Sequence, residues 1–148
     1  MPKPVITRSA TGGVLQVLGT QVRFLCTAEE TGKKWSLMEV SLPKAAGAPP
    51  HSHPWDEAYY VLTGEVRFVV GGVAHLLRAG DFLYAPANTI HAFEGHSEEM
   101  ARVIIFDAPA HAENFFREID AGVKNMPADL DKMLAVGERH QVSFAPPG

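Results

Sequence analysis

The sequence between residues 14 and 107 is a series of short apolar or alternating segments that glycine and proline separate. Alternation of apolar and polar residues with a period of two is typical of strands with one buried face. The expected strands span residues 14–18, 21–26, 34–42, 57–62, 65–70, 73–77, 82–85, 91–94 and 102–106. Helical periodicity is almost absent from this part of the chain, so the pattern predicts an all-β domain.

Glycine-containing turns separate neighbouring segments at residues 63–64, 71–72 and 79–81. Short turns of this kind join antiparallel strands, so the sequence predicts three successive hairpins that form a meander. Many short, evenly spaced strands favour a closed barrel or a sandwich of two sheets, because closure removes exposed strand edges.

The pattern changes after residue 107, where apolar residues recur at helical spacing. Residues 112–120 are expected to form one helix that stops at Gly122, and a second helix is expected from Pro127. The predicted apolar stripes are Phe115, Phe116 and Ile119 in the first helix and Leu130, Met133 and Leu134 in the second. The predicted organisation is an N-terminal arm (1–13), a β-barrel (14–107) and a C-terminal helical extension (108–148), with the helices outside the barrel or over one end.

Composition and charge limit the classes of function. The chain has 148 residues, of which 46% are hydrophobic, which suits a single core. Its formal net charge is −4 and no basic block is longer than Lys33-Lys34, which argues against a nucleic acid partner. The lone Cys26 excludes an intrachain disulfide, the N-terminal region lacks a signal-peptide pattern, and no apolar run approaches the roughly 18 residues that cross a bilayer. We therefore expect a soluble, cytoplasmic protein that acts on a small molecule.

Four residues in two stretches have the chemistry and spacing of a metal site. His51 and His53 lie two apart in an extended segment, so their side chains point to the same side. A turn at Pro54 lets the carboxylate of Glu57 return toward both imidazoles, and His91 follows a second turn-forming stretch. Imidazole nitrogens and a carboxylate oxygen suit a borderline divalent ion. The sequence thus predicts one divalent ion, of iron, manganese, nickel, copper or zinc, held by His51, His53, Glu57 and His91.

Three imidazoles and one carboxylate leave one or two coordination positions of such an ion open. An open position distinguishes catalytic sites from purely structural ones. The chain has seven histidines, and the remaining four are predicted to be surface or ordinary polar residues: His75, His96, His111 and His140.

This pattern resembles that of the cupin superfamily, whose two motifs read G-x5-H-x-H-x3,4-E-x6-G and G-x5-P-x-G-x2-H-x3-N. The first motif is matched by His51, His53, Glu57 and Gly64, and the second by Gly80, Pro86 and His91. The sequence departs from the motifs at Gly47, which lies two residues too close to His51, at Asn88 in place of a glycine, and at Gly95 in place of an asparagine. None of these departures removes a ligand, and asparagine tolerates a left-handed turn better than other non-glycine residues.

The resemblance implies a jelly-roll barrel, or double-stranded β-helix, with one or two C-terminal α-helices. The C-terminal part, residues 112–144, resembles the extension of small quercetin dioxygenase-like cupins. This likeness implies a metal-dependent dioxygenase acting on an aromatic or enolisable substrate, with Glu57 as the catalytic residue that moves the substrate proton. Cupins of this kind commonly form homodimers through N-terminal strands, and residues 14–26 are apolar enough for that role or for burial within their own barrel.

A flat aromatic substrate would need a pocket of aromatic and sulfur-containing side chains. The strands offer as candidates Phe24, Trp35, Met38, Tyr60, Phe68, Phe82, Tyr84, Phe93 and Phe106, although aromatic residues in strands are usually plain core residues. Trp55 lies between two ligands in a loop and is predicted to guard the mouth of the pocket.

Two other functions remain open at this point. A metal-dependent isomerase or lyase acting on a sugar or keto acid would need a further ionisable residue in the barrel to move a proton. The strand positions that could supply it are Glu39, Arg67, His75 and Arg102. A non-catalytic cupin would use the metal only to hold a small ligand.

Overall fold

The computed structural model describes residues 2–145 as two β-sheets with two helices beside them. The strands are β1 (Leu15–Val17), β2 (Thr20–Cys26), β3 (Ser36–Leu42), β4 (Gly47–Ser52), β5 (Asp56–Thr63), β6 (Glu65–Val70), β7 (Val73–Arg78), β8 (Phe82–Ala85), β9 (His91–Gly95), β10 (Ala101–Ala108) and β11 (Ser143–Phe144). The helices are α1 (Ala112–Gly122) and α2 (Leu130–Arg139), and a short 3-10 helix, η1 (Glu29–Thr31), precedes β3. The prediction of an all-β domain followed by helices is confirmed.

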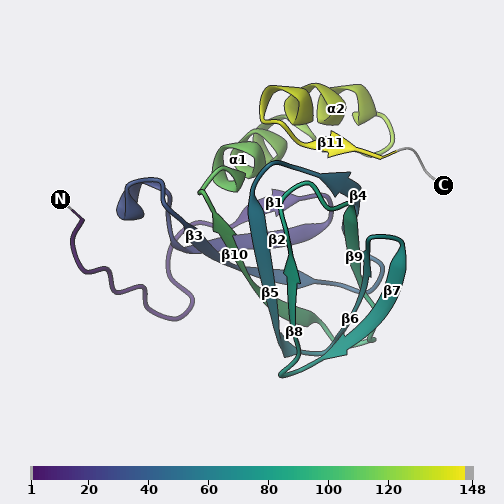
Figure 1. The fold of residues 1–148 in the computed structure, drawn as a ribbon, viewed down its shortest axis with the longest axis horizontal. Coiled ribbons are helices and arrows are strands. Elements are labelled where there is room, and N and C mark those ends of the chain that lie inside the picture. Colours follow the sequence, from purple (N-terminus) through teal and green to yellow (C-terminus); the bar gives the residue numbers. More distant parts are fainter. Residues whose placement is uncertain (1, 146–148) are drawn as a thin grey trace.

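The two sheets have the strand orders β1-β2-β3-β10-β5-β8 and β11-β4-β9-β6-β7. Neighbouring strands in both sheets are antiparallel. Figure 1 shows β6 and β7 on the opposite side of the molecule from β2 and β3, as in the predicted jelly roll. Within residues 2–145 the hydrogen bonds do not close one continuous barrel, because the first sheet ends at β1 and β8 and the second at β11 and β7.

The core lies between the sheets and follows from the alternation in the sequence. In β3 every second residue, from Ser36 to Leu42, is buried, and the residues between them are only half-buried. One inward-facing row crosses four neighbouring strands of the first sheet and consists of Val22, Val40, Val103 and Val61. Each buried side chain of this size contributes about 1.5 to 3 kcal/mol, so such rows fix which face of each strand turns inward.

The predicted meander is wrong, because only one of the three turns joins strands that pair with each other. The turn at 71–72 is a hairpin, with Val70 opposite Val73. At 63–64 and 79–81, however, the chain passes from one sheet to the other, so that β5 pairs with β8 and not with β6. A glycine turn predicts that the chain reverses, but it does not specify the sheet that the next strand joins.

Gly64 makes the first of these crossings possible. Its φ is 72°, in the left-handed region, and a Cβ added to it would lie 2.8 Å from the Cα of Ala101. The crossing therefore requires glycine for two reasons, the backbone conformation and the close approach of β10.

We expect Gly64→Ala to lower the free energy of unfolding by about 2 to 4 kcal/mol, because backbone strain and a backbone clash add up. Gly72→Ala is the matched control, since Gly72 has a φ of 82° but nothing within 4 Å of an added Cβ. That variant should cost only about 1 kcal/mol, from the strain alone. Urea unfolding midpoints measure both, and equal shifts would contradict the role of the close approach.

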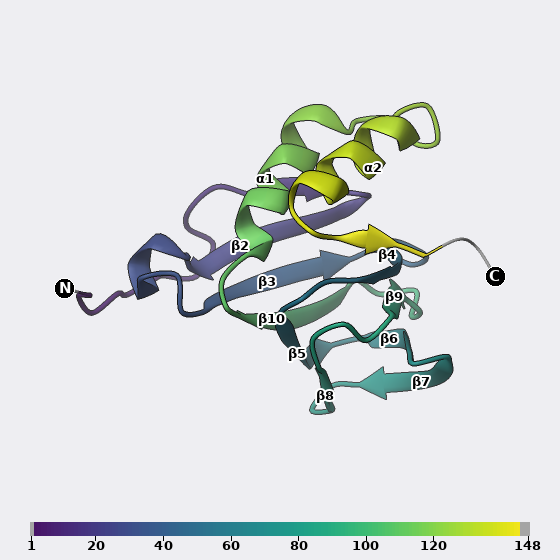
Figure 2. The ribbon, with the colours of Figure 1, turned by 45° about the horizontal axis from the view of Figure 1, so that its top comes forward.

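The helices lie together at one end of the sheets, beside β1 and β11 (Figures 1 and 2). α1 buries Phe115 and Ile119, two of the three residues in its predicted stripe, against the core. The helices thus lie over one end of the barrel, which is one of the two positions predicted from the sequence.

The predicted stripe of α2 is correct only at Met133. Leu130 and Leu134 are exposed, and the buried positions beside Met133 are Val136 and Gly137. The reason is that the chain folds back over this face after the helix, where the Val142 N–H donates to the Gly137 carbonyl at 2.8 Å. Among residues 2–145, no helix is long and apolar enough to span a membrane.

Two strands were not expected from the sequence, β4 and the short β11, and they pair with each other. Ser143 lies opposite Ser52, and Phe144 opposite His51. Prolines interrupt the alternation of β4, whose register with β9 shifts between Ala48 and His51. β11 thus attaches the C-terminal extension to the strand that carries the predicted ligand His51.

The N-terminal segment that could form a dimer contacts its own sheet. β1 and β2 lie at one edge of the first sheet, and Val17 and Val22 are buried in the core. The preceding arm runs beside β2, where the Thr7 hydroxyl donates to the Leu25 carbonyl at 2.6 Å. A homodimer formed through residues 14–26 stays a prediction.

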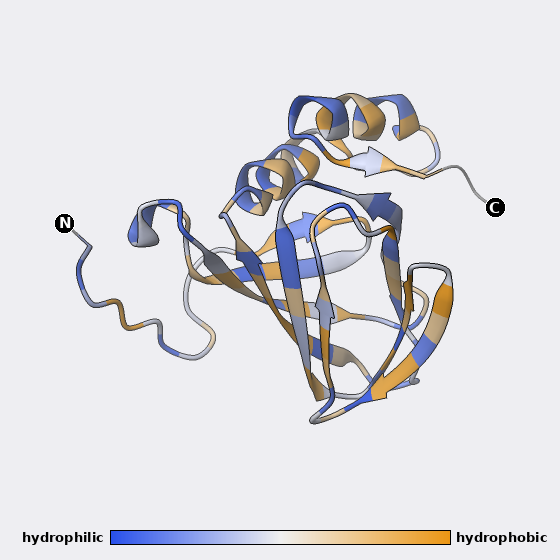
Figure 3. Cartoon of the chain, in the orientation of Figure 1, coloured by the Kyte–Doolittle hydropathy of each residue, from blue (hydrophilic) through white to orange (hydrophobic). Residues whose placement is uncertain are grey.

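β7 is an exposed edge strand with a hydrophobic composition. Figure 3 shows it as mostly hydrophobic along its length, and Val73 and Leu76 are nonetheless exposed. It pairs only with β6 among the described strands, so its outer edge carries backbone groups without a strand partner.

Candidate metal centre

Four side chains from three strands and one connection meet between the two sheets. His51 on β4 is the register partner of His91 on β9, and His53 follows in the connection to β5. Glu57 reaches the same point from β5, in the other sheet. All four residues are buried, and one possible ligand atom from each lies within 4.8 Å of those of the others. The fold thus brings the four predicted ligands together.

Backbone carbonyls orient the three imidazoles. The Nδ1 atoms of His51, His53 and His91 lie 2.7, 3.0 and 2.8 Å from the carbonyl oxygens of Pro49, Trp55 and Thr89. In each case the accepting residue is two positions away in the chain. Because the carbonyl oxygen can only accept, Nδ1 carries a proton there, and Nε2 is the atom left to face Glu57 or a metal ion. This second contact is what fixes the ring orientation of histidines that ligate metals.

The Nε2 atoms converge on the carboxylate. Glu57 Oε1 lies 2.5 Å from His53 Nε2 and 3.4 Å from His91 Nε2. Burial alone would raise the pKa of Glu57, but hydrogen bonds to His53 and His91 outweigh it and hold that pKa well below its ordinary value. The carboxylate is therefore an anion, as a metal ligand must be.

The pKa values of His51 and His91 shift in opposite directions. Burial lowers the pKa of His51 to about 4, with a further contribution from the charge of His91. Burial also lowers the pKa of His91, but the hydrogen bond to Glu57 outweighs it and the net change is upward. His51 is thus a neutral nitrogen ligand over the whole neutral pH range.

This donor set fits a divalent metal ion. Three imidazole nitrogens and one carboxylate oxygen suit iron, manganese, nickel, copper or zinc, and they leave part of the coordination sphere to another molecule. His53 Nε2, His91 Nε2 and Glu57 Oε1 already face one point, so only small adjustments are needed to hold an ion there.

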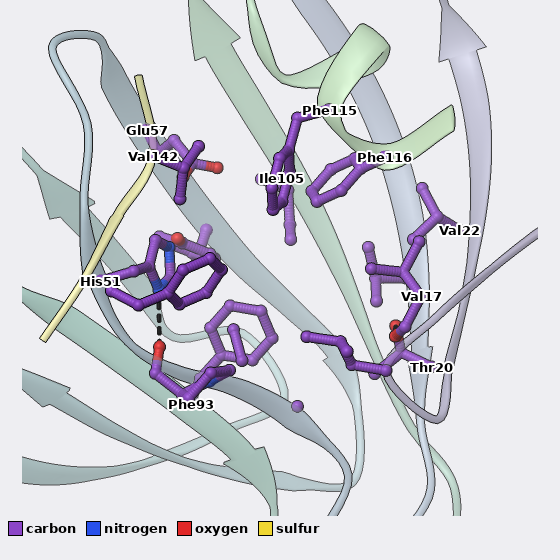
Figure 4. A pocket seen from close by; sticks show the side chains of 17 residues that line it. Val17, Thr20, Val22, His51, Glu57, Phe93, Ile105, Phe115, Phe116 and Val142 are labelled. Atoms are coloured by element: carbon purple, nitrogen blue, oxygen red, sulfur yellow. Dashed lines mark hydrogen bonds between the residues drawn. The ribbon is translucent and has the colours of Figure 1, made fainter. Parts of the chain in front are cut away.

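A narrow cavity of about 50 Å³ adjoins the site (Figure 4). His51 and Glu57 lie on one side of it, and Val17, Thr20 and Val22 lie on the other. The rest of the lining is almost entirely apolar and includes Leu18, Val40, Tyr59, Phe93, Ile105, Phe115, Phe116, Val142 and Phe144. β-strands supply the walls and the C-terminal extension supplies the roof. A cavity of this volume has room for about four water molecules.

Most of the predicted pocket residues do not line this cavity. The prediction is wrong for five aromatic side chains that are exposed: Trp35, Tyr60, Phe82, Tyr84 and Phe106. They lie on the outer face of the first sheet, where Phe82 is 62% exposed and stands opposite Tyr60. The reason is the phase of the alternation, since Glu57 points inward and Tyr60, three positions later, must point outward.

The other predicted pocket residues are buried or half-buried, and only Phe93 of them lines the cavity. Met38 and Phe68 belong to the core, and Phe24 packs against it. Trp55 is fully buried and does not guard a mouth; its ring stacks on His53 with centroids 4.1 Å apart.

Several residues of the site were missed. Tyr59 lines the cavity two positions after Glu57, so the alternation that fixes Glu57 could have identified it. Asp107 is buried opposite Glu57 in the register of β10 and β5, and its Oδ2 accepts the Ala112 N–H at the start of α1. The roof residues of the extension carry no comparable signal, because their contact with the cavity depends on the tertiary fold.

The ionisable residues considered for an isomerase or lyase do not face the cavity. Arg67, His75 and Arg102 are exposed. Glu39 pairs with Arg102 at 2.8 Å and with Arg23 at 3.7 Å on the outer face of the first sheet. The acidic and basic groups in the cavity wall are those of the metal site itself.

Comparison with known proteins agrees with this geometry. The Cupin domain family model matches residues 38–107, which contain all four ligands. A quercetin 2,3-dioxygenase of Bacillus subtilis is 29% identical over 120 residues, a match that covers 78% of this chain and 34% of that protein. Residues 38–107 thus form a cupin domain. It spans about a third of the length of this relative.

Solved cupin structures share the fold. An RmlC-like cupin from Shewanella frigidimarina has a TM-score of 0.66 at 19% identity, covering 76% of this chain and 96% of that one. A predicted oxalate decarboxylase from Thermotoga maritima also has a TM-score of 0.66, at 20% identity, covering 71% of this chain and 99% of that one. At this level of identity the likeness shows the fold alone.

Replacing His53 or His91 with alanine is expected to remove the metal from the cupin, because each supplies one of only four ligands. His75→Ala is the matched control, since His75 is exposed on β7 and should leave the metal content unchanged. Elemental analysis after dialysis measures occupancy, and circular dichroism checks the fold. Full occupancy in both site variants would refute the assignment.

Proposed function

We propose that the protein is a metal-dependent dioxygenase that acts on an aromatic or enolisable small molecule. The observation that carries the proposal is a set of three histidines and one glutamate beside an almost entirely apolar cavity. The similarity to quercetin 2,3-dioxygenase supports the same class of reaction.

A bound redox-active ion would supply Lewis acidity to a substrate enolate or phenolate and a route for its reaction with dioxygen. The protein would hold that ion through His51, His53, Glu57 and His91. Hydrogen bonds from Nδ1 to backbone carbonyls keep the rings in place, so the ligands need no rearrangement when substrate enters.

Glu57 is the residue that we propose to move the substrate proton. It contacts both His53 and His91 through a single oxygen, Oε1. Its other oxygen can accept a proton from a carbon acid or hydroxyl group held in the cavity. No other carboxylate of the described residues lines the cavity, so proton transfer within it falls to Glu57.

The apolar walls would favour this reaction by excluding water. Phe115, Phe116 and Val142 cover the cavity from the C-terminal extension, and Ile105 and Phe93 form part of its strand walls. A substrate anion would be poorly solvated against the apolar walls. It would therefore be more stable next to the ion than anywhere else in the cavity.

Oxygen uptake is the decisive measurement. The metal-free protein is reconstituted separately with iron, manganese, nickel, copper and zinc, and each form is tested with flavonols, diketones, hydroxyketones and catechols. We expect substrate-dependent oxygen consumption with at least one redox-active metal, and a loss of at least about 100-fold in Glu57→Gln. His75→Ala serves again as the control.

If no combination of metal and substrate gives oxygen uptake, the proposal is contradicted. Conversion of a sugar or keto acid without oxygen consumption would instead favour an isomerase or lyase. Tight ligand binding without turnover by any reconstituted form would indicate a non-catalytic binding cupin.

A further inference from the structure

The cavity beside the metal ligands adjoins a larger groove at the surface. Among the residues that line the cavity, Pro49 is the only exposed one. Pro49 also lines an apolar groove of about 610 Å³ between the turn after β1 and the connection from α1 to α2. Leu18, in that turn, is the second residue that lines both spaces. Leu18 and Pro49 therefore lie between the groove and the cavity.

Leu18 has a backbone conformation that leucine rarely adopts. Leu18 and Gly19 are the two central residues of the turn from β1 to β2, with φ values of 51° and 83°. Turns with two positive φ values favour asparagine or glycine at the first central position. Leu18 is the only large apolar residue among the non-glycine residues of positive φ in the range 2–145. Turn geometry thus does not explain a leucine here, whereas a side chain that closes the cavity does.

The groove has the lining of a site for an aromatic group. Met126, Leu130 and Met133 of the helical extension face the turn and the start of β4 across it. Methionine side chains adapt to flat rings and contact them favourably through sulfur. Met126 and Leu130 are 46% and 41% exposed, so both are free to contact a ligand. The exposure of Leu130, which the stripe of α2 did not predict, is explained by this position.

The groove also offers space that the cavity lacks. The cavity measures about 50 Å³, whereas an apolar protein cavity that holds benzene measures about 150 Å³. The ring of an aromatic substrate therefore needs room beside the cavity, and the volume of the groove is typical of small-molecule sites.

A second hollow adjoins the cavity from the outer face of the second sheet. It measures about 260 Å³ and is lined in part by Arg67 and Glu94. β4 and β9 pair on both sides of Pro49, at Ala48 and at His51, so the paired strands lie between this hollow and the metal ligands. Charged side chains also suit an apolar ring less well than the lining of the groove does.

We infer that the groove binds the aromatic part of the substrate, and that Leu18 is the gate through which the oxygen-bearing end reaches the metal ligands. Leu130 contacts the ring and Leu18 controls access, so both determine specificity. The inference rests on the proposed function for the class of substrate, but binding can be measured without turnover.

The first test measures affinity in the zinc-loaded protein without oxygen. The probes are 3-hydroxyflavone and maltol, which share a hydroxypyrone end, whereas only 3-hydroxyflavone carries aromatic rings beside it. Their ultraviolet absorbance reports binding, and elemental analysis checks the zinc content. Leu130→Gln removes an apolar side chain from the groove. Leu134→Gln is the matched control, since Leu134 lies on the same helix, is 43% exposed and does not line the groove.

We expect Leu130→Gln to bind 3-hydroxyflavone about three- to ten-fold more weakly than wild type, because part of an apolar contact is lost. Its affinity for maltol should be unchanged, and Leu134→Gln should match the wild type with both probes. Absence of 3-hydroxyflavone binding to the wild type would overturn the inference, as would an equal loss for both probes or no loss in Leu130→Gln. A loss confined to Val69→Gln would place the ring in the hollow on the second sheet and also overturn it.

The second test measures association rates of both probes by stopped flow. Leu18→Ala removes the gate, and Leu18→Gly does so while relieving the backbone strain, which protects the fold. Ala45→Gly is the matched control, because it relieves a φ of 69° at an exposed turn that lines neither space. We expect both Leu18 variants to bind at least about three-fold faster than wild type, and Ala45→Gly to bind at the wild-type rate.

Unchanged rates in both Leu18 variants would refute the gate, and so would an equal acceleration in Ala45→Gly. Failure of the proposed function would appear separately. In that case the protein would bind both probes as expected, but no reconstituted form would consume oxygen.

Discussion

The hydrogen bonds from three imidazoles to the main chain are the interaction on which the site depends. Each imidazole is held by a carbonyl only two residues from its own position. The orientation of each ring is therefore fixed by local backbone conformation, which the strands and turns of the two sheets determine. Side chains elsewhere in the cavity can change without disturbing the ligands, so the same centre can accompany different pockets.

The sequence identifies the ligands because their signal is local. Two histidines in alternation, a glutamate after a turn and a histidine after another turn need only strand geometry to meet on one side. The pairing of strands was less predictable, since the turns at 63–64 and 79–81 look like hairpins and are crossings between sheets. The choice of sheet depends on long-range packing, which turn residues do not encode.

The pocket shows a different limit. Tyr60, Phe82 and Phe106 were predicted to line the pocket because they are aromatic residues in strands. Glu57 points inward, however, so the alternation along its strand turns Tyr59 inward and Tyr60 outward. One ligand of known orientation thus fixes the facing of its whole strand and, through the register, of its neighbours. The roof could not be predicted in this way, because Phe115, Phe116 and Phe144 reach the cavity from one helix and one strand far along the chain.

The stacking of Trp55 on His53 has a spectroscopic consequence. The two rings are nearly parallel, at 6°, so the indole lies directly against a ligand of the metal site. The chain has one other tryptophan, Trp35, which lies at the surface and stacks on Phe106. The buried indole should emit at shorter wavelength than the exposed one, and a paramagnetic ion on His53 would quench the buried indole selectively. The protein therefore carries an intrinsic fluorescent reporter of whether its centre is filled.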